Sequence, residues 1–494
     1  METRFRDVRL YLMIPLAGLA MPLAAQDTTL GQVVAGAPGS TALQVVTGEA
    51  VQNTCGELAG TYRPVIGANR PATTPEEDLF FRCNEMVQTA NLLNGNPDAA
   101  LNNLGWTSGQ LAEAMQQLTG EEQVSKGRLA TESSNGQFAH IGMRLDAIRA
   151  GARATASGLR LALNDAPVVG GNAGEEGESP WSWFVNGAYG NGDRDATARE
   201  DQYDYDAYGA TLGVDYLLDS GAVVGVALGY SDYEVDFDSS GSPLPMNDLT
   251  SRVAGGGFSL DGYAVSAYAI GNIGRFYVDG LVSYGMNDYD TERRVSYRGS
   301  SSGGNRGQNL VVNRAMSGST DSDSLGVGVS TGTQFELGVV DLALDVGLSY
   351  LDVTVDGYTE REQALAGDES SAGGLALAYE DQDFESLQSS LGFQFSRPFS
   401  TQSGVILPYL GAAWRHEFRN DADTVAARYA AQQTGQTFNL TIGSDDPDED
   451  YFELGLGVSA VFANRITAFV DYSTTLGLED VSASLFTIGV RGSF

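Results

Sequence analysis

The chain contains 494 residues with a formal net charge of −36 and 62 glycines, and its single lysine is Lys126. Acidity of this degree argues against nucleic acid as a partner, because a nucleic-acid-binding surface needs positive charge. Beyond the N-terminus, no run approaches the ~20 apolar residues that a membrane-spanning helix requires.

Residues 1–25 have the pattern of a secretory signal peptide. Arginines at positions 4, 6 and 9 precede an apolar run from residue 10 to 23, and Ala24-Ala25 supply small residues for cleavage. A short membrane anchor is the alternative. Export would place Cys55 and Cys83 in an oxidising compartment, so the sequence predicts a disulfide between them, with two free thiols as the alternative.

Residues 26–120 show no strand alternation and are predicted to form a short, mainly helical domain. Apolar side chains at three- and four-residue spacing predict a helix over 76–93. Thr107 or Ser108 can cap a second helix that reaches Leu118. A disulfide from Cys55 would then join the first helix to the coil that precedes it, which would help to stabilise so small a domain.

Residues 121–165 are predicted to form one long basic helix, and the capping pattern Thr119-Gly120-Glu121-Glu122 marks its start. Its second half is slim, since it is rich in alanine and glycine, and it carries four arginines: Arg144, Arg149, Arg153 and Arg160. Such a helix is either an exposed surface helix or a plug that fits a narrow acidic channel. Residues 166–180 are predicted to be a flexible linker.

From residue 181 onward, segments alternate between apolar side chains on one face and small or polar ones on the other. This pattern is typical of lipid-facing strands and predicts an all-β transmembrane barrel. Twelve antiparallel strands are predicted at 181–192, 203–218, 222–237, 256–270, 275–290, 321–335, 340–355, 376–396, 404–418, 449–462, 465–473 and 482–494. Long polar connections alternate with tight turns, as in outer-membrane barrels.

The parity of the strands also predicts which side chains face the lumen. Five carboxylates alternate with apolar residues that must face lipid: Asp215, Asp279, Asp345, Glu453 and Asp471. A basic helix inside the barrel would give these carboxylates positive partners, whereas a helix outside would not.

The final strand directs Phe486, Ile488, Val490 and Phe494 to one face, and the terminal phenylalanine resembles the signal by which bacterial outer-membrane barrels are recognised for insertion. Residues 181–494 resemble the autotransporter translocator domain of type V secretion. The resemblance is carried by residues 277–295, 350–360, 418–429 and 468–494, and residues 137–159 are similar to the helical lead-in of some members.

This resemblance implies a Gram-negative outer-membrane location, a passenger formed by residues 26–120 at the cell surface, and a helix inside a twelve-stranded pore. The partners implied are outer-membrane lipid, the inner-membrane secretion translocon, periplasmic chaperones and the barrel-assembly machinery. Two features depart from the family pattern: the passenger is short and helical, and it contains a cysteine pair. The alternatives are a porin-like channel and a hydrolase displayed on the surface.

Two sequence motifs could indicate a functional site, but each also has a simpler structural interpretation. Residues 328–332 (GVSTG) match the nucleophile-elbow pattern of hydrolases but lie inside a predicted strand, so Ser330 is predicted to be a small lumen-facing residue. The acidic run 445–450 could hold calcium, yet a solvated loop is the simpler interpretation. No catalytic, cofactor or metal site is therefore predicted.

Overall fold

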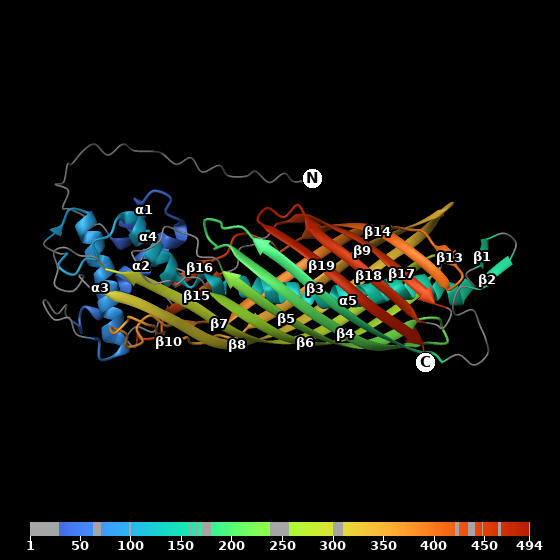
Figure 1. The fold of residues 1–494 in the computed structure, drawn as a ribbon, viewed down its shortest axis with the longest axis horizontal. Coiled ribbons are helices and arrows are strands. Elements are labelled where there is room, and N and C mark those ends of the chain that lie inside the picture. The colour runs from blue at the N-terminus through green and yellow to red at the C-terminus, as the bar shows by residue number, and fades with distance from the viewer. Residues whose placement is uncertain are drawn as a thin grey trace, which may run out of the picture.

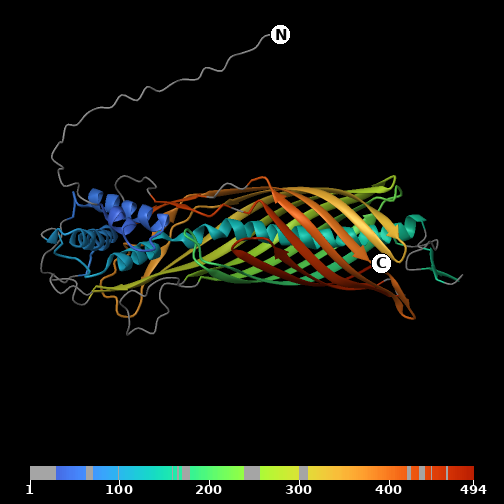
Figure 2. The same cartoon turned by 90° about the horizontal axis from the view of Figure 1, so that it is seen from above.

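The structure is a computed structural model that describes residues 29–62, 71–97, 100–157, 160–163, 166–169, 179–237, 256–299, 310–419, 424–432, 440–446, 448–462 and 466–493. For residues 127, 130, 132, 134, 149–157, 160–163 and 166–169 only the backbone is described. A long β-barrel holds one helix along its axis and carries a cluster of helices at one end (Figures 1 and 2).

Twelve strands close the barrel, and every neighbouring pair is antiparallel, which confirms the predicted fold class. They are β3 Trp181–Arg194, β4 Tyr203–Leu217, β5 Val223–Phe237, β6 Gly257–Ile273, β7 Phe276–Arg298, β8 Val311–Leu337, β9 Val340–Val355, β12 Gln382–Ser396, β14 Gly404–Glu417, β17 Asp450–Phe462, β18 Thr467–Leu476 and β19 Val481–Ser493. The pairing of β19 with β3 closes the ring. At the short-turn end, Gly274 and Gly338 adopt the positive φ that their turns need.

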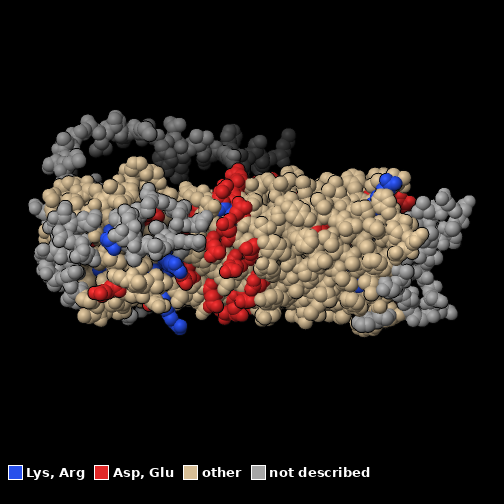
Figure 3. Space-filling model, in the orientation of Figure 1, with Lys and Arg blue, Asp and Glu red and all other residues tan. Residues whose placement is uncertain are grey.

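Towards the long-loop end of the strands, the outward-facing side chains change from apolar to acidic. Along β7, Val282 and Met286 face outward, but the next outward position is the exposed Asp288, whereas its inward neighbour Tyr289 is buried. The same change in neighbouring strands produces a band of carboxylates across the face of the barrel that Figure 3 shows. This acidic belt comprises Asp204, Asp206, Glu234, Asp261, Asp288, Asp290, Asp321, Asp323, Asp383 and Glu385. The belt therefore marks the limit of the apolar, lipid-facing band.

Beyond the belt, the chain forms a structure that we call the extension. It contains the ends of β7 and β8 that lie beyond the belt, together with β10 Arg361–Ala364, which pairs with β8. It also contains a separate sheet of β11 Leu377–Tyr379, β15 Thr424–Tyr429 and β16 Leu440–Gly443. The long polar connection expected between the predicted strands 275–290 and 321–335 was therefore partly wrong, because β7 and β8 continue into it as a paired ribbon. The strand expected at 376–396 is divided into β11 and β12.

Four helices form the cluster at the long-loop end, which we call the cap: α1 Leu30–Ala35, α2 Ala42–Leu58, α3 Pro75–Leu93 and α4 Ser108–Thr119. Threonine side chains cap all four N-termini by accepting a backbone N–H bond. The two helices expected near 76–93 and 108–118 are present. Cys55 lies in α2, so the coil expected around it was wrong.

A short 3-10 helix, η2 Glu121–Gln123, leads into the long helix α5 Ser125–Ser157, which runs through the barrel (Figure 2). The helix predicted over 121–165 was too long, because Arg160 lies in β1 Arg160–Leu163, which pairs with β2 Ala166–Val169. Along the part of the chain that the structure describes, no helix has both the length and the apolar character to cross a bilayer.

Candidate functional site

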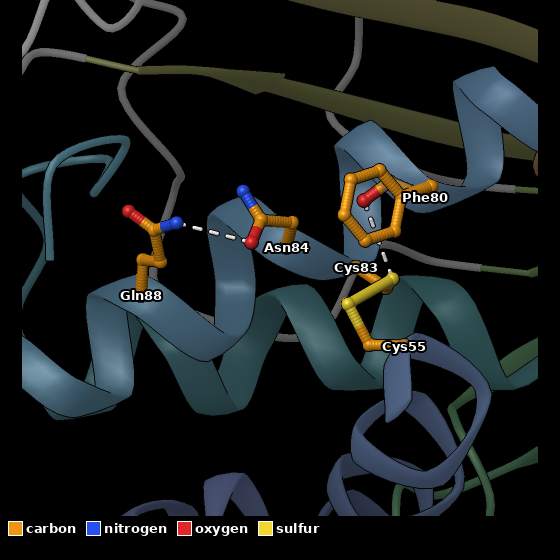
Figure 4. Close-up of a disulfide and its surroundings, with 5 residues drawn as sticks. All are labelled: Cys55, Phe80, Cys83, Asn84 and Gln88. Atoms are coloured by element: carbon orange, nitrogen blue, oxygen red, sulfur yellow. Dashed lines mark hydrogen bonds between the residues drawn. A yellow bond between two sulfur atoms is a disulfide. The ribbon is translucent and has the colours of Figure 1, made fainter. Parts of the chain in front are cut away.

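A disulfide joins Cys55 of α2 to Cys83 of α3, which confirms the predicted pairing (Figure 4). Both cysteines are buried among the apolar side chains of the cap, and their Cα atoms are 5.5 Å apart. The bond fixes two helices that are separated by a long connection, and it restricts the unfolded cap.

The cap and the extension share one apolar core. Trp106 lies edge-on to Tyr297 of β7, with ring centroids 5.2 Å apart, and its indole N–H donates to the carbonyl of Arg298 at 3.0 Å. The extension contributes to this core Val295, Tyr297, Val312, Met316, Leu377, Val425 and Ile442. Neither part has a complete core without the other, so the cap is docked as part of one folding unit.

A buried ionic cluster crosses the same interface. The guanidinium of Arg314 in β8, which is 0% exposed, donates to both carboxylate oxygens of Asp78 in α3, at 2.6 and 3.1 Å. It also donates to Asp368 at 2.8 Å and pairs with Glu362 at 2.9 Å. Burial opposes ionisation of Asp368, but the charge of Arg314 outweighs it and holds the pKa of that carboxyl below its usual value. Asp78 also accepts from the backbone N–H of Gly374 at 3.0 Å, so this charge is fully paired.

A second arginine joins the end of α4 to the extension. Arg293 of β7 donates to Glu360 at 3.0 and 2.6 Å and to the carbonyl of Gln117 at 3.1 Å. Gly120, which ends α4 with a φ of +69°, has no room for a Cβ atom because Tyr379 and Leu377 lie against it. The chain therefore passes from the cap into the barrel through a closely packed segment.

Lys126 occupies this segment, which we call the neck. Its ammonium lies 4.3 Å from the ring centroid of Tyr358 and 5.7 Å from that of Tyr289, and it donates to the Tyr358 hydroxyl at 3.2 Å. Burial lowers the pKa of Lys126 to about 7, although the carboxylates of Glu360 and Glu122 oppose that shift.

Next to the neck, on its barrel side, a layer of buried apolar and aromatic side chains surrounds α5. Leu129 of α5 is 0% exposed and packs among inward-facing aromatic rings. These rings come from β4, β5, β6 and β7: Tyr203, Tyr205, Tyr233, Phe237, Phe258 and Tyr289. Neighbouring rings pack in tilted pairs, so aromatic side chains surround the helix at this level of the barrel.

Deeper in the lumen, α5 is bonded to the wall made by β3 and β4. His140 Nδ1 lies 2.8 Å from the Thr211 hydroxyl, and that hydroxyl donates its proton to Gln137 Oε1 at 3.0 Å. One turn further, Arg144 pairs with the buried Asp215 at 2.7 and 2.5 Å. At this pair, a predicted helix arginine contacts a predicted lumen carboxylate. The side chains of the other three predicted arginines, Arg149, Arg153 and Arg160, lie outside the described residues.

The remaining predicted lumen carboxylates have partners from the barrel wall or face the lumen cavity. Arg415 of β14 binds Glu453 at 2.9 and 2.7 Å, and Tyr409 donates to Asp471 at 2.8 Å. Ser330 donates to Asp279 at 2.8 Å, and Asp345 lines the cavity beside the helix. Sequence reasoning missed Arg415, which pairs with Tyr451 in the register of β14 and β17 and reaches Glu453 two residues further along β17.

The other residues singled out in the sequence have structural positions. Phe486, Ile488 and Val490 face outward on β19, whereas Phe494 lies outside the described residues. Asp445 accepts from Arg194 at 2.9 Å rather than lying in an open loop. Among the described residues, no group of three or more His, Cys, Asp or Glu side chains is arranged to hold a metal ion.

Comparison with known proteins identifies the family. The chain is 24% identical over 305 residues to the esterase EstA of Pseudomonas aeruginosa, which covers 62% of this chain but only 42% of that relative. Similar solved structures are the translocator domain of the autotransporter NalP from Neisseria meningitidis (17% identity, TM-score 0.46, 74% of this chain and 98% of that one) and the beta domain of the Bordetella autotransporter Brka (17%, 0.41, 64% and 100%). The model of the autotransporter beta-domain family matches residues 183–473, more than half of the chain, and the chain therefore belongs to that family.

Proposed function

We propose that the cap is the passenger of this autotransporter: the barrel delivers residues 26–120 to the cell surface, and the passenger then stays bound at the mouth of the barrel. As a family member, the chain is a Gram-negative outer-membrane protein. A closed barrel pairs every backbone group within the wall, so it anchors the chain in lipid.

The shared core of cap and extension is the observation that carries this proposal. The extension lies beyond the acidic belt, on the side of the barrel where the long loops lie. Because the cap buries apolar side chains and Asp78 against it, the cap gains its full stability only after it has reached that side. Docking on the extension thus favours delivery of the cap to the long-loop side of the barrel and opposes its return through the barrel.

In this proposal, the route begins at the inner-membrane secretion translocon, continues with periplasmic chaperones and ends at the barrel-assembly machinery. The outward row Phe486, Ile488 and Val490, together with Phe494, would be the signal that this machinery reads. Outer-membrane lipid surrounds the apolar band below the belt.

The proposal gives the cap a structural rather than an enzymatic role. EstA is named an esterase, but the chain spans less than half of its length. Within the described residues, Ser330 of the hydrolase-like motif is bonded to Asp279 in the barrel wall, and His140 lies in α5 beside Thr211. These two side chains lie in strands and a helix that build the lumen, away from the cap.

Two measurements test the proposal, one on expressing cells and one on the purified chain. Immunoblots against the cap should detect it on the full-length chain in the outer membrane, with no soluble fragment in the medium. The purified chain should hydrolyse no short-chain p-nitrophenyl ester above the buffer rate. A discrete cap fragment released without added protease would contradict retention, and ester hydrolysis that survives Ser330→Ala would contradict the structural role of the cap.

A further inference from the structure

One face of α5 is matched to the barrel wall residue by residue. Four polar side chains at three- and four-residue spacing form a single stripe along the helix: Ser133, Gln137, His140 and Arg144. Their hydrogen-bond partners on the strands β4, β5 and β6 are Thr211, Asp215, Ser231 and Ser266. A slip of the helix by one turn would bring His140 or Ile148 to Asp215 in place of Arg144. The stripe therefore fits the wall in one register.

Two inward-facing glycines of the wall leave room for side chains of the same part of the helix. Gly326 of β8 lies against the end of the Phe138 ring, so a Cβ atom at position 326 would overlap ring carbons. Gly229 of β5 lies in the same way against the side-chain amide of Gln137. This amide accepts from the Thr211 hydroxyl at 3.0 Å, so it cannot turn away without losing that bond. We call Gly229 and Gly326 the sockets.

The sockets hold the helix from two sides. Gln137 and Phe138 are successive residues, so their side chains point about 100° apart around the helix axis. They enter sockets on β5 and β8, which are not neighbouring strands. At the next inward-facing glycine of β8, Gly328, no described atom outside its chain neighbours lies within 4 Å of the place that a Cβ would take. The helix therefore requires a glycine at position 326 but not at position 328.

The helix carries this position to the neck. The helix α5 is continuous, and Lys126 precedes Phe138 by 12 residues, or about 18 Å of helix. A shift of the helix by one residue at the sockets would move Lys126 by about 1.5 Å and turn it by about 100°, away from the rings of Tyr289 and Tyr358. Because a helix does not stretch, the sockets also set the place at which the chain enters the cap.

We propose that Gly229 and Gly326 are positioning residues that fix α5 at one depth and one rotation in the barrel, so that movement of the chain ends where the cap meets the extension. The inference rests on the proposed delivery of the cap, because it names the step at which that delivery stops. Further outward movement would withdraw the Phe138 ring from Gly326 and separate Arg144 from Asp215. The two glycines act through the helix, since the side chains that they receive belong to α5.

A cross-link in the full-length chain reads the register of the helix. The hydroxyl oxygens of Ser133 and Ser231 lie 2.9 Å apart, and the described chain has no free cysteine, so Ser133→Cys with Ser231→Cys should form a disulfide in this register. Peptide mass spectrometry on outer membranes detects it. Adding Gly326→Leu should abolish this disulfide in the folded, heat-modifiable barrel. Adding Phe138→Ala as well should restore it, because the shorter side chain no longer needs the socket. The matched control, Gly328→Leu, should keep the disulfide.

Docking of the cap gives a second readout. In detergent, protease should digest the cap of the Gly326→Leu variant, and adding Phe138→Ala should restore its resistance. The other socket is tested in the same way: Gly229→Val should abolish the cross-link, and adding Gln137→Ala should restore it. If the Gly326→Leu barrel does not fold, recovery of the folded barrel by Phe138→Ala supports the same contact.

Four results would overturn the proposal. They are a cross-link that survives both socket variants, an equal loss in Gly328→Leu, no recovery of either the cross-link or the fold when the helix side chain is shortened, and a lost cross-link with a cap that still resists protease. The cross-link reports the register whichever side of the membrane the cap occupies. A failure of the proposed delivery, read by labelling of the cap on intact cells, is therefore distinguishable from a failure of the sockets.

Discussion

Asp78 of α3 and Arg314 of β8 stand 236 residues apart in the sequence, yet they form a buried two-point ion pair with N–O distances of 2.6 and 3.1 Å. The pair joins the cap to a strand that continues into the membrane-spanning wall. The cap is therefore held directly on the barrel, and the contribution of this ion pair to its docking can be measured.

Replacing Arg314→Gln should loosen the cap. The change leaves three buried carboxylates facing a neutral side chain, and removing one partner of a buried pair costs about 3–5 kcal/mol. In detergent, limited proteolysis should digest the cap of this variant while the barrel remains intact. The matched control is Arg294→Gln, whose pair with Glu292 is exposed and contributes about 0–1 kcal/mol, so its cap should resist digestion as the wild type does.

Replacing Cys55→Ser and Cys83→Ser together should destabilise the cap alone. Loss of a disulfide of this kind costs about 2–4 kcal/mol, and both cysteines lie outside the barrel wall. Denaturant unfolding followed by Trp106 fluorescence should shift to lower concentration, while the heat-modifiable mobility of the barrel stays unchanged. In the wild-type protein no thiol should be alkylated before reduction, and an alkylated thiol would contradict the pairing.

Arg144→Gln should destabilise the helix within the lumen. Asp215 would keep the hydroxyl of Tyr268 as a donor at 3.1 Å but lose its positive partner. We expect a loss of about 3–5 kcal/mol, read as a lower temperature for loss of the folded barrel band. Adding Asp215→Asn should recover part of the loss, because residues in contact are not additive. Full additivity of the two changes would contradict the pairing.

The stability of the cap should pass through a minimum near neutral pH. Burial, together with the charge of Asp201, raises the pKa of Glu113 to about 7, and burial raises the pKa of Glu122 to about 7. The folded state therefore holds more protons than the unfolded state between pH about 4.5 and 7, and stability falls as the pH rises through that window.

Lys126 makes stability increase with pH above neutral pH. Its folded pKa of about 7 lies below the usual value, so the folded state holds fewer protons and stability rises from pH 7 towards 10. Glu113→Gln should flatten the acid side of the profile and Lys126→Met the alkaline side, measured as cap unfolding midpoints in denaturant. Unchanged profiles in both variants would contradict the assignment.

The barrel strands could be predicted because lipid imposes a strict alternation on every one of them. The parts of β7 and β8 in the extension did not follow that pattern. Past Met286 the outward side chains of β7 become acidic, and the inward ones are a mixture of polar residues and buried Tyr289, Val295 and Tyr297. In isolation such a segment looks like a polar loop. The parity never changes, so the change of the outward side chains to acidic ones was itself the signal available in the sequence.

The contacts of the site were less predictable. Asp215 and Arg144 could be expected to meet, because strand parity and helix charge both point to the lumen. The pairing of Arg314 with Asp78 could not be foreseen, because it depends on how α3 docks on β8 and no local pattern encodes that docking. Arg160 was misplaced because the basic run continues past Ser157, where α5 ends.

Labelling of intact cells with a membrane-impermeant maleimide tests the central claim, that the exported cap stays docked at the outer mouth. Asn94→Cys places a thiol on the exposed end of α3, and Ser220→Cys places one in the short turn between β4 and β5. We expect Asn94→Cys to be labelled on intact cells, and Ser220→Cys only after the outer membrane is permeabilised. Protection of Asn94→Cys on intact cells, with labelling after permeabilisation, would place the cap in the periplasm and contradict the account.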